Sequence, residues 1–117
     1  MSHAHSEKQK RIHEFLHQNP IGILSTVTPN GEPHGAVIYF VIDDDFTASF
    51  LTRCGTRKSD NIKHQDHVTL TVYEPESQTT AQIIGRAKEI NDNDRVNSIA
   101  SDVLRISLKT SEAGIPP

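Results

Sequence analysis

The chain has 117 residues and a mass of 13.0 kDa, which fits a single domain over residues 1–117. Hydrophobic residues make up 34%, and no apolar run approaches the roughly 20 residues that a membrane-spanning helix needs, so we expect no membrane protein. The formal net charge of −3 lacks the basic excess typical of proteins that bind nucleic acid. The beginning of the chain is polar and unlike a secretory signal, which favours a cytoplasmic protein.

The number of cysteines and the size of the predicted core exclude further classes of protein. A single cysteine, Cys54, cannot form an internal disulfide and excludes a zinc cluster built on cysteines. The chain has no tryptophan, and aromatic residues make up 5%, so the predicted core is thin. A domain of this kind is expected to gain stability from a partner subunit, a cofactor or both.

The first predicted element is a helix over residues 6–18, with Ser6 as its N-cap. Asn19-Pro20 ends it, because the residue before a proline is disfavoured in the helical conformation. Its apolar face, spaced at i, i+3 and i+4, consists of Ile12, Phe15 and Leu16.

Five strands follow between residues 21 and 90, with a short helix inserted at about 56–64. The predicted strands are 21–27, 34–42, 46–52, 67–73 and 79–90. Thr28-Pro29-Asn30-Gly31 has strong turn chemistry and joins the first two as a hairpin. Hairpin-length connections predict an antiparallel meander, and five such strands in a small domain predict a barrel.

The second strand is apolar at every position from 36 to 42. This pattern predicts a central strand that is buried on both sides or that faces a ligand.

A last helix is predicted over residues 92–108, and residues 111–117 are predicted to be a tail. The helical spacing of its apolar residues argues for an amphipathic helix. These residues are Val96, Ile99, Ala100, Val103, Leu104 and Leu108.

The segment from His13 to His17 matches the H-E-x-x-H pattern of zinc proteases. A catalytic zinc needs a third protein ligand, and no extension of the motif supplies one. We therefore expect two histidines beside an apolar stripe and no zinc site. His64 and His67 lie at a junction between a helix and a strand, where polar residues are usual, and we expect no metal there either.

A basic cluster follows the third strand. Arg53, Arg57 and Lys58 surround Thr52 and Thr56 at the start of the short helix. Cations, hydroxyl groups and the amides of a helix N-terminus are what a phosphate group requires. The pattern does not match the Walker phosphate loop, and a solvated basic turn is the alternative interpretation.

These residues carry a resemblance. Phe50-Leu51-Thr52, followed by Gly55-Thr56-Arg57-Lys58-Ser59-Asp60-Asn61-Ile62 and then by His67-Val68-Thr69-Leu70, resembles the pyridoxamine 5′-phosphate oxidase-like family of FMN-binding split barrels. The strand pair 22–27 and 33–37 and the later segment Ala81–Ala87 also resemble this family. The resemblance covers residues 21–90, about two thirds of the chain.

The resemblance implies a mainly β fold, an antiparallel split barrel of five to six strands, and a homodimer with FMN at its interface. Arg57 and Lys58 would hold the FMN phosphate, helped by the hydroxyl groups of Thr52 and Thr56. Other positions would contact the isoalloxazine ring. They are the backbone of Val37, Ile38, Tyr39 and Phe40 and, from the other subunit, one of Gln78, Thr80 and Gln82, of which Thr80 stands at the family's glutamine position.

The resemblance also implies an FMN-dependent oxidoreductase acting on an unidentified small molecule. Efficient oxidation of pyridoxamine 5′-phosphate is not expected, because Ala36 stands where the oxidase has a basic residue and the oxidase's C-terminal segment is absent. Three alternatives stay open: a non-catalytic flavin-binding protein, for example in stress response; a split barrel that uses a deazaflavin or haem; and a small nucleic-acid-binding barrel. The acidic net charge speaks against the last of these.

Overall fold

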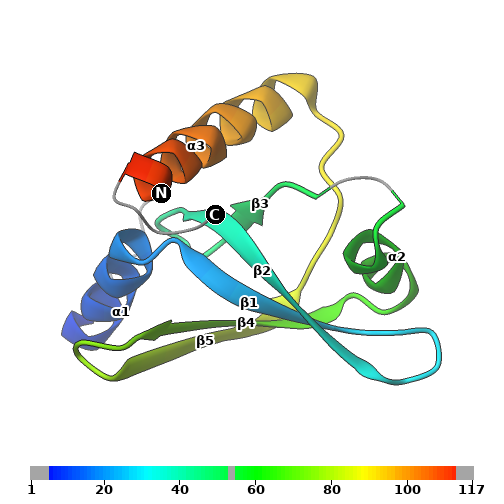
Figure 1. Cartoon of the computed structure of the whole chain (residues 1–117), viewed down its shortest axis with the longest axis horizontal. Helices are drawn as coiled ribbons and strands as arrows, with labels where there is room; N and C mark the ends of the chain where they lie inside the picture. Colours follow the sequence, from blue (N-terminus) through cyan, green and yellow to red (C-terminus); the bar gives the residue numbers. More distant parts are fainter. Residues whose placement is uncertain (1–5, 53–54, 113–117) are drawn as a thin grey trace. The chain divides into compact units, whose positions relative to one another are not determined.

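The computed structural model describes residues 6–52 and 55–112. Within them the chain forms three helices and five antiparallel strands, which confirms the mainly β fold class expected for a split barrel (Figure 1). The elements are α1 (Glu7–Gln18), β1 (Ile21–Val27), β2 (Pro33–Ile42), β3 (Ala48–Phe50), α2 (Arg57–His64), β4 (His67–Glu74), β5 (Thr79–Arg86) and α3 (Asn93–Glu112). None of the helices in these residues combines the length and the apolar character that crossing a membrane demands.

Most predicted boundaries lie within a few residues of the observed ones, with three differences. β3 has only three residues, β5 ends at Arg86, and α3 runs to Glu112 and so includes the first two residues of the predicted tail. Residues 113–117 lie outside the described part of the chain.

The strand order is β3-β2-β1-β4-β5, so the simple meander predicted from the sequence is wrong. β4 pairs with β1 instead of β3, with Leu24 opposite Leu70. The connection that contains α2 is much longer than a hairpin turn and allows this change of neighbour. β3 offers only three residues for pairing, whereas β1 offers seven.

The chain folds into two compact units. The first consists of Met1–Pro20, Tyr39–Leu51 and Asn91–Pro117, and the second of Ile21–Ile38 and Thr52–Ile90. The first unit therefore holds α1, the end of β2, β3 and α3. The second holds β1, the beginning of β2, α2, β4 and β5.

In the second unit, alternate residues of β1 and β4 point to a buried face of the sheet. Leu24, Leu70 and Val72 are buried there, and Thr26 and Asn61 are buried polar residues. Gly22 belongs to the same face, because a Cβ atom at this position would lie 2.8 Å from the Thr71 carbonyl oxygen and 2.9 Å from Leu70 Cδ1. Close packing of β1 on β4 therefore depends on the missing side chain at residue 22.

In the first unit, α1 begins with a capping box in which Ser6 Oγ accepts from the Gln9 amide and Gln9 Oε1 accepts from the Ser6 amide. Leu16 of this helix and Phe40 of β2 are buried. The Phe40 amide donates to the Pro20 carbonyl oxygen at 2.9 Å, which ties the end of β2 to the residues after α1.

Neighbouring side chains of β2 differ in exposure, so burial on both sides, one of the two alternatives that the sequence left open, is wrong, and a strand that faces a ligand stays a prediction. Val37 is 61% exposed, whereas Ile38 and Phe40 are 4% and 0% exposed. The apolar run therefore has one face in the core and one face with an exposed valine, a pattern that leaves room for a ligand or a partner.

Candidate functional site

The start of α2 is set by two residues with non-helical backbones. Gly55 has a φ of +80°, in the left-handed region that favours glycine. Thr56 is extended and caps the helix, because its Oγ1 accepts a hydrogen bond from the Ser59 amide at 3.3 Å. The chain therefore turns sharply into α2 at the point where the basic pair Arg57-Lys58 begins.

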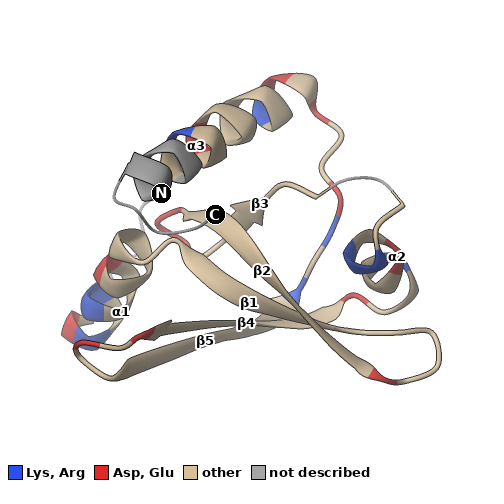
Figure 2. Cartoon of the chain, viewed as in Figure 1, with Lys and Arg blue, Asp and Glu red and all other residues tan. Residues whose placement is uncertain are grey.

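The structure brings together four of the predicted site residues here, and we call them the phosphate cluster: Thr52, Thr56, Arg57 and Lys58. Thr52 Oγ1 and Thr56 Oγ1 lie 3.1 Å apart, within hydrogen-bond distance. Arg57 is exposed and Lys58 is half-buried, both in the first turn of α2, where Figure 2 shows basic colouring. Arg53 and Cys54 lie outside the described residues.

The phosphate cluster has the donors that an anion needs. The first amides of a helix lack partners within the helix, and the helix dipole favours negative charge at this end. Two cationic side chains add further donors at the same place, and one of the two threonine hydroxyl groups donates to the other. The arrangement suits a phosphate group.

A buried hydrogen bond holds α2 against the sheet of the second unit. Asn61 Nδ2 donates to Thr26 Oγ1 at 3.0 Å, and both side chains are almost completely buried. The sequence analysis missed both residues. The available signal was a threonine on the inward-facing side of an apolar strand, which needs a polar partner when buried.

The second strand residues Val37, Ile38, Tyr39 and Phe40 were predicted to line the ring edge with their backbone. Val37 and Ile38 belong to the second unit, and Tyr39 and Phe40 to the first. β3 pairs with β2 at Phe40, Val41 and Ile42. The backbone at Val37 and Ile38 precedes this pairing, so the edge of β2 that faces away from β1 carries no β3 partner there among the described residues.

The polar residues of the fifth strand are separated from the phosphate cluster. Thr80 and Gln82 are exposed on β5, and Gln82 Nε2 donates to Thr71 Oγ1 at 3.2 Å. Thr71 pairs with both Gln82 and Ile23, so these three side chains share one face of the sheet. Thr26, which holds α2, has the opposite parity to Ile23 on β1, so α2 packs on the other face.

Gln78 was predicted to share a strand face with Thr80 and Gln82, and this is wrong. It lies in the turn before β5 with a φ of +52°, and its amide lies 3.3 Å from the Pro75 carbonyl oxygen. β5 begins at Thr79, as the sequence predicted, and Gln78 therefore precedes the strand.

The H-E-x-x-H segment packs within the first unit. His13 Nε2 lies 3.0 Å from the Asp43 carbonyl oxygen, and its ring contacts Phe46 edge-on with centroids 5.6 Å apart. The rings of His13 and His17 are stacked 6.5 Å apart. Through these contacts, the imidazole of His13 connects α1 to the turn after β2. Residues 6–52 and 55–112 contain no group of three or more side chains arranged to hold a metal ion.

Comparison with known proteins decides the family. The family model described as pyridoxamine 5′-phosphate oxidase matches residues 9–114, which is most of the chain. The chain belongs to this family. No curated protein matches the chain significantly.

Three solved structures are similar in fold to this chain. A pyridoxamine 5′-phosphate oxidase-related, FMN binding protein from Nostoc punctiforme has 20% identity and a TM-score of 0.63, over 82% of this chain and 55% of that chain. A protein described as F420 reductase has 27% identity and a TM-score of 0.60, over 65% and 61%. A haem binding protein from Mycobacterium smegmatis has 11% identity and a TM-score of 0.73, over 94% and 47%. The chain thus spans about half to three fifths of the length of these structures.

Proposed function

We propose that the protein binds FMN and holds the phosphate of the cofactor in the phosphate cluster. The observation that carries this proposal is the pair of threonine hydroxyl groups 3.1 Å apart beside Arg57 and Lys58. A phosphate dianion accepts several hydrogen bonds at once, and this cluster offers hydroxyl, guanidinium, ammonium and amide donors on one short segment. The family membership supports the same assignment.

The isoalloxazine ring would lie along the edge of β2 at Val37 and Ile38. A flat ring with alternating donors and acceptors needs backbone N–H and C=O groups that are not consumed by a neighbouring strand. β3 pairs with β2 only from Phe40 onward among the described residues, so the edge at Val37 and Ile38 fits this need. When bound, FMN supplies redox chemistry, and the protein supplies binding and orientation.

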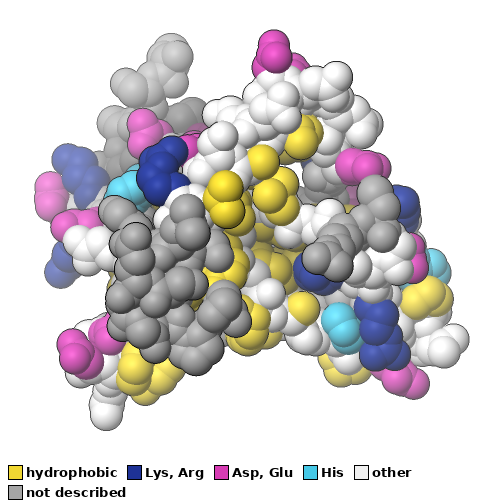
Figure 3. Space-filling view, turned by 45° about the horizontal axis from the view of Figure 1, so that its top comes forward, with side chains coloured by type: hydrophobic (Ala, Val, Ile, Leu, Met, Phe, Trp, Pro, Cys, Tyr) yellow, Lys and Arg dark blue, Asp and Glu magenta, His cyan; other side chains and the backbone are white. Residues whose placement is uncertain are grey.

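We propose that the functional form is a homodimer in which β5 of one copy completes the flavin site of the other. Thr80 and Gln82 face away from α2 in their own chain, so a second copy is the direct way to bring them to a ring. Figure 3 shows hydrophobic side chains, coloured yellow, at the surface of the molecule. The side of the sheet that carries Gln82 has exposed apolar side chains of its own. In the second unit these are Ile23 at 42%, Tyr73 at 58%, Val37 at 61% and Ile84 at 78% exposure.

The proposed activity is that of a cytoplasmic FMN-dependent oxidoreductase acting on a small molecule. The alternatives are a flavin-binding protein without turnover, and a relative that carries a deazaflavin or haem, as the described F420 reductase and haem binding protein suggest. Pyridoxamine 5′-phosphate is not proposed as an efficient substrate, because the second strand carries Ala36 where a cation would be needed.

The deciding experiment measures the affinity of the purified protein for FMN and for riboflavin by calorimetry. One charge-assisted contact contributes about 1.5–3 kcal/mol, so Lys58→Ala or Arg57→Ala is expected to weaken FMN binding roughly 10- to 100-fold. Lys63→Ala, in the last turn of the same helix, is the matched control and is expected to leave FMN affinity unchanged. Equal affinity for FMN and riboflavin would contradict the proposal, and the visible spectrum of the released cofactor distinguishes flavin, deazaflavin and haem.

A further inference from the structure

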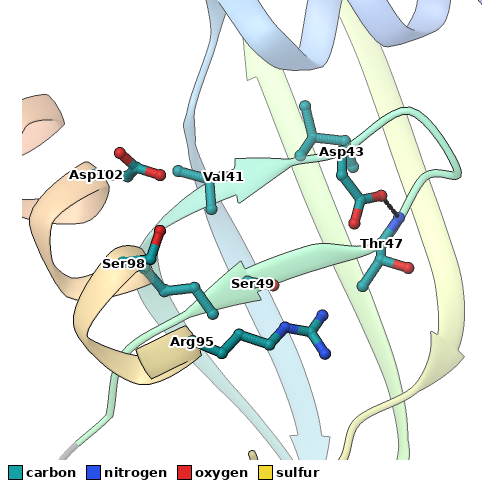
Figure 4. A pocket seen from close by; sticks show the side chains of 9 residues that line it. Val41, Asp43, Thr47, Ser49, Arg95, Ser98 and Asp102 are labelled. Carbon is teal, nitrogen blue, oxygen red and sulfur yellow. Dashed lines mark hydrogen bonds between the residues drawn. The ribbon is translucent and has the colours of Figure 1, made fainter. Parts of the chain in front are cut away.

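A pocket of about 270 Å³ lies within the first unit, where the start of α3 faces the hairpin of β2 and β3 (Figure 4). Its size suits a ligand smaller than a typical drug molecule. Its lining includes Val41, Thr47, Ser49, Arg95, Ser98 and Asp102.

Three polar side chains of α3 line the pocket in a row. Arg95, Ser98 and Asp102 are separated by three and four residues and therefore lie on one face of the helix. Arg95 and Asp102 are two turns apart, which is about 10 Å along the helix axis. In Figure 4 the Arg95 side chain extends toward Thr47 and the Asp102 carboxylate lies at the other end, near Val41.

Two charged side chains of α3 line the pocket, the cation of Arg95 at one end and the anion of Asp102 at the other. No carboxylate of the described residues lies within ion-pair distance of Arg95, which is exposed at the surface. The Asp102 carboxylate pairs with Arg105 at 2.6 Å, yet its side chain remains 41% exposed and retains acceptor sites. A third acidic residue of the lining, Asp43, forms hydrogen bonds within its own turn: its Oδ1 accepts from the amides of Asp45 and Thr47.

The space between the charged ends is mixed in character. Val41 on β2 and Ser49 on β3 are directly paired, so their side chains lie on the same face of the hairpin, which lines the pocket. Ile99 adds an apolar group from α3, next to the hydroxyl of Ser98. An aliphatic segment can therefore pack in the middle while a polar group at either end meets a charge.

We propose that this pocket binds a small elongated zwitterion, with its carboxylate at Arg95 and its ammonium group at Asp102. An ω-amino carboxylate with a short aliphatic chain satisfies both charges and covers Val41 and Ile99. A phosphate or a simple carboxylate satisfies only the Arg95 end and brings no donor to the remaining acceptor sites of Asp102. The inference concerns the first unit alone and does not depend on flavin binding.

The test is a titration of the isotopically labelled protein, as purified, followed by NMR chemical shifts. The four probes are ε-aminocaproate, caproate, hexylamine and inorganic phosphate. We expect saturable shifts at the pocket residues with ε-aminocaproate, and affinities at least about 10-fold weaker for each probe that has one charge, since one charged contact contributes about 1.5 kcal/mol or more. Phosphate or caproate binding as tightly, or no saturation by about 10 mM, a concentration far above a useful dissociation constant, would overturn the proposal.

Two variants separate the ends of the pocket. Arg95→Gln is expected to weaken ε-aminocaproate and caproate but not hexylamine, whereas Asp102→Asn is expected to weaken ε-aminocaproate and hexylamine but not caproate. Lys10→Gln and Asp94→Asn remove charges from α1 and from the first turn of α3 without touching the pocket, and serve as controls. The opposite pattern, or an equal effect of the controls, would refute the assignment. If a variant does not fold, the ranking of the four probes on the unaltered protein decides.

Discussion

Asn61 Nδ2 donates to Thr26 Oγ1 over 3.0 Å, and the two side chains are 3% and 2% exposed. This bond joins α2 to β1 through two residues that are 35 positions apart in sequence. The position of α2 determines where Thr56, Arg57 and Lys58 lie, because all three belong to its first turn or cap. The buried pair is therefore a positioning element for the phosphate cluster.

Replacing Asn61 by alanine is expected to lower the free energy of unfolding by about 1–3 kcal/mol, because Thr26 then loses its buried partner. Flavin affinity is expected to fall as well, since α2 is no longer held in place. Urea unfolding and calorimetry measure the two effects. Asn97→Ala, at an exposed position of α3, is the control. The double variant Asn61→Leu/Thr26→Val removes both polar groups, and a loss larger than that of Asn61→Ala plus Thr26→Val would contradict this account.

The contrast between Gly22 and Gly85 gives a second prediction. A Cβ atom at residue 22 would lie 2.8 Å from backbone oxygen and 2.9–3.0 Å from Leu70 and Val72, whereas a Cβ atom at residue 85 would meet nothing within 4 Å. Gly22→Ala is expected to destabilise the fold by about 1–3 kcal/mol through overpacking. Gly85→Ala is expected to be neutral or slightly stabilising, because glycine is entropically costly in a strand. Equal midpoints of thermal unfolding for the two variants would show that β1 and β4 can separate without cost.

Local elements were predictable because their signals are local. Ser6 before an apolar stripe and Pro20 after it fixed the helix that the structure places at Glu7–Gln18. The change from helical to alternating spacing at Ile21 marked β1 correctly over Ile21–Val27. The grouping of Thr52, Thr56, Arg57 and Lys58 followed from their short separation in sequence, and in the structure the two threonine hydroxyl groups lie 3.1 Å apart.

Long-range relationships were not predictable in the same way. The pairing of β4 with β1 depends on contacts between segments more than 40 residues apart, and the period of the sequence carries no information about such neighbours. The same limit hid the Asn61–Thr26 bond and the alternating burial of β2, because an apolar strand has the same pattern whether its outer face meets protein, ligand or solvent.

A third prediction concerns Glu74, the last residue of β4. Its Oε2 accepts from the Ser77 hydroxyl at 2.5 Å and the Ser77 amide at 2.7 Å, and Oε1 accepts from the Glu76 amide at 2.9 Å. These bonds lower the pKa of Glu74 below its ordinary value of 4.5, the hydroxyl of Ser77 having the largest effect. Because the folded pKa is lowered, the stabilisation is present above 4.5 and is lost as pH falls through the folded pKa.

Ser77→Ala is therefore expected to raise the pKa of Glu74 toward the ordinary value, as measured by the side-chain carboxyl shift during an NMR titration. Ser98→Ala, on α3, is a control of the same chemistry in the other unit and is expected to leave this titration unchanged. An unaltered Glu74 titration in Ser77→Ala would show that the backbone amides alone set the pKa.

The last prediction tests the dimer through the exposed face of the sheet in the second unit. Ile84 is 78% exposed on β5 and lies on the same face as Thr80 and Gln82, so a charge at this position costs little in an isolated chain. At an interface the same charge is buried without a partner, which costs several kcal/mol. Ile84→Glu is accordingly expected to convert a dimer into a folded monomer of 13.0 kDa and to weaken flavin binding with it.

Leu104→Glu on α3, 61% exposed, is the matched control and is expected to remain dimeric. Light scattering coupled to size exclusion measures both. A dimer that persists in Ile84→Glu but dissociates in Leu104→Glu would show that the interface lies on α3. An unaltered protein that is monomeric at micromolar concentration would contradict the proposed contact of Thr80 and Gln82 with the flavin of a second copy.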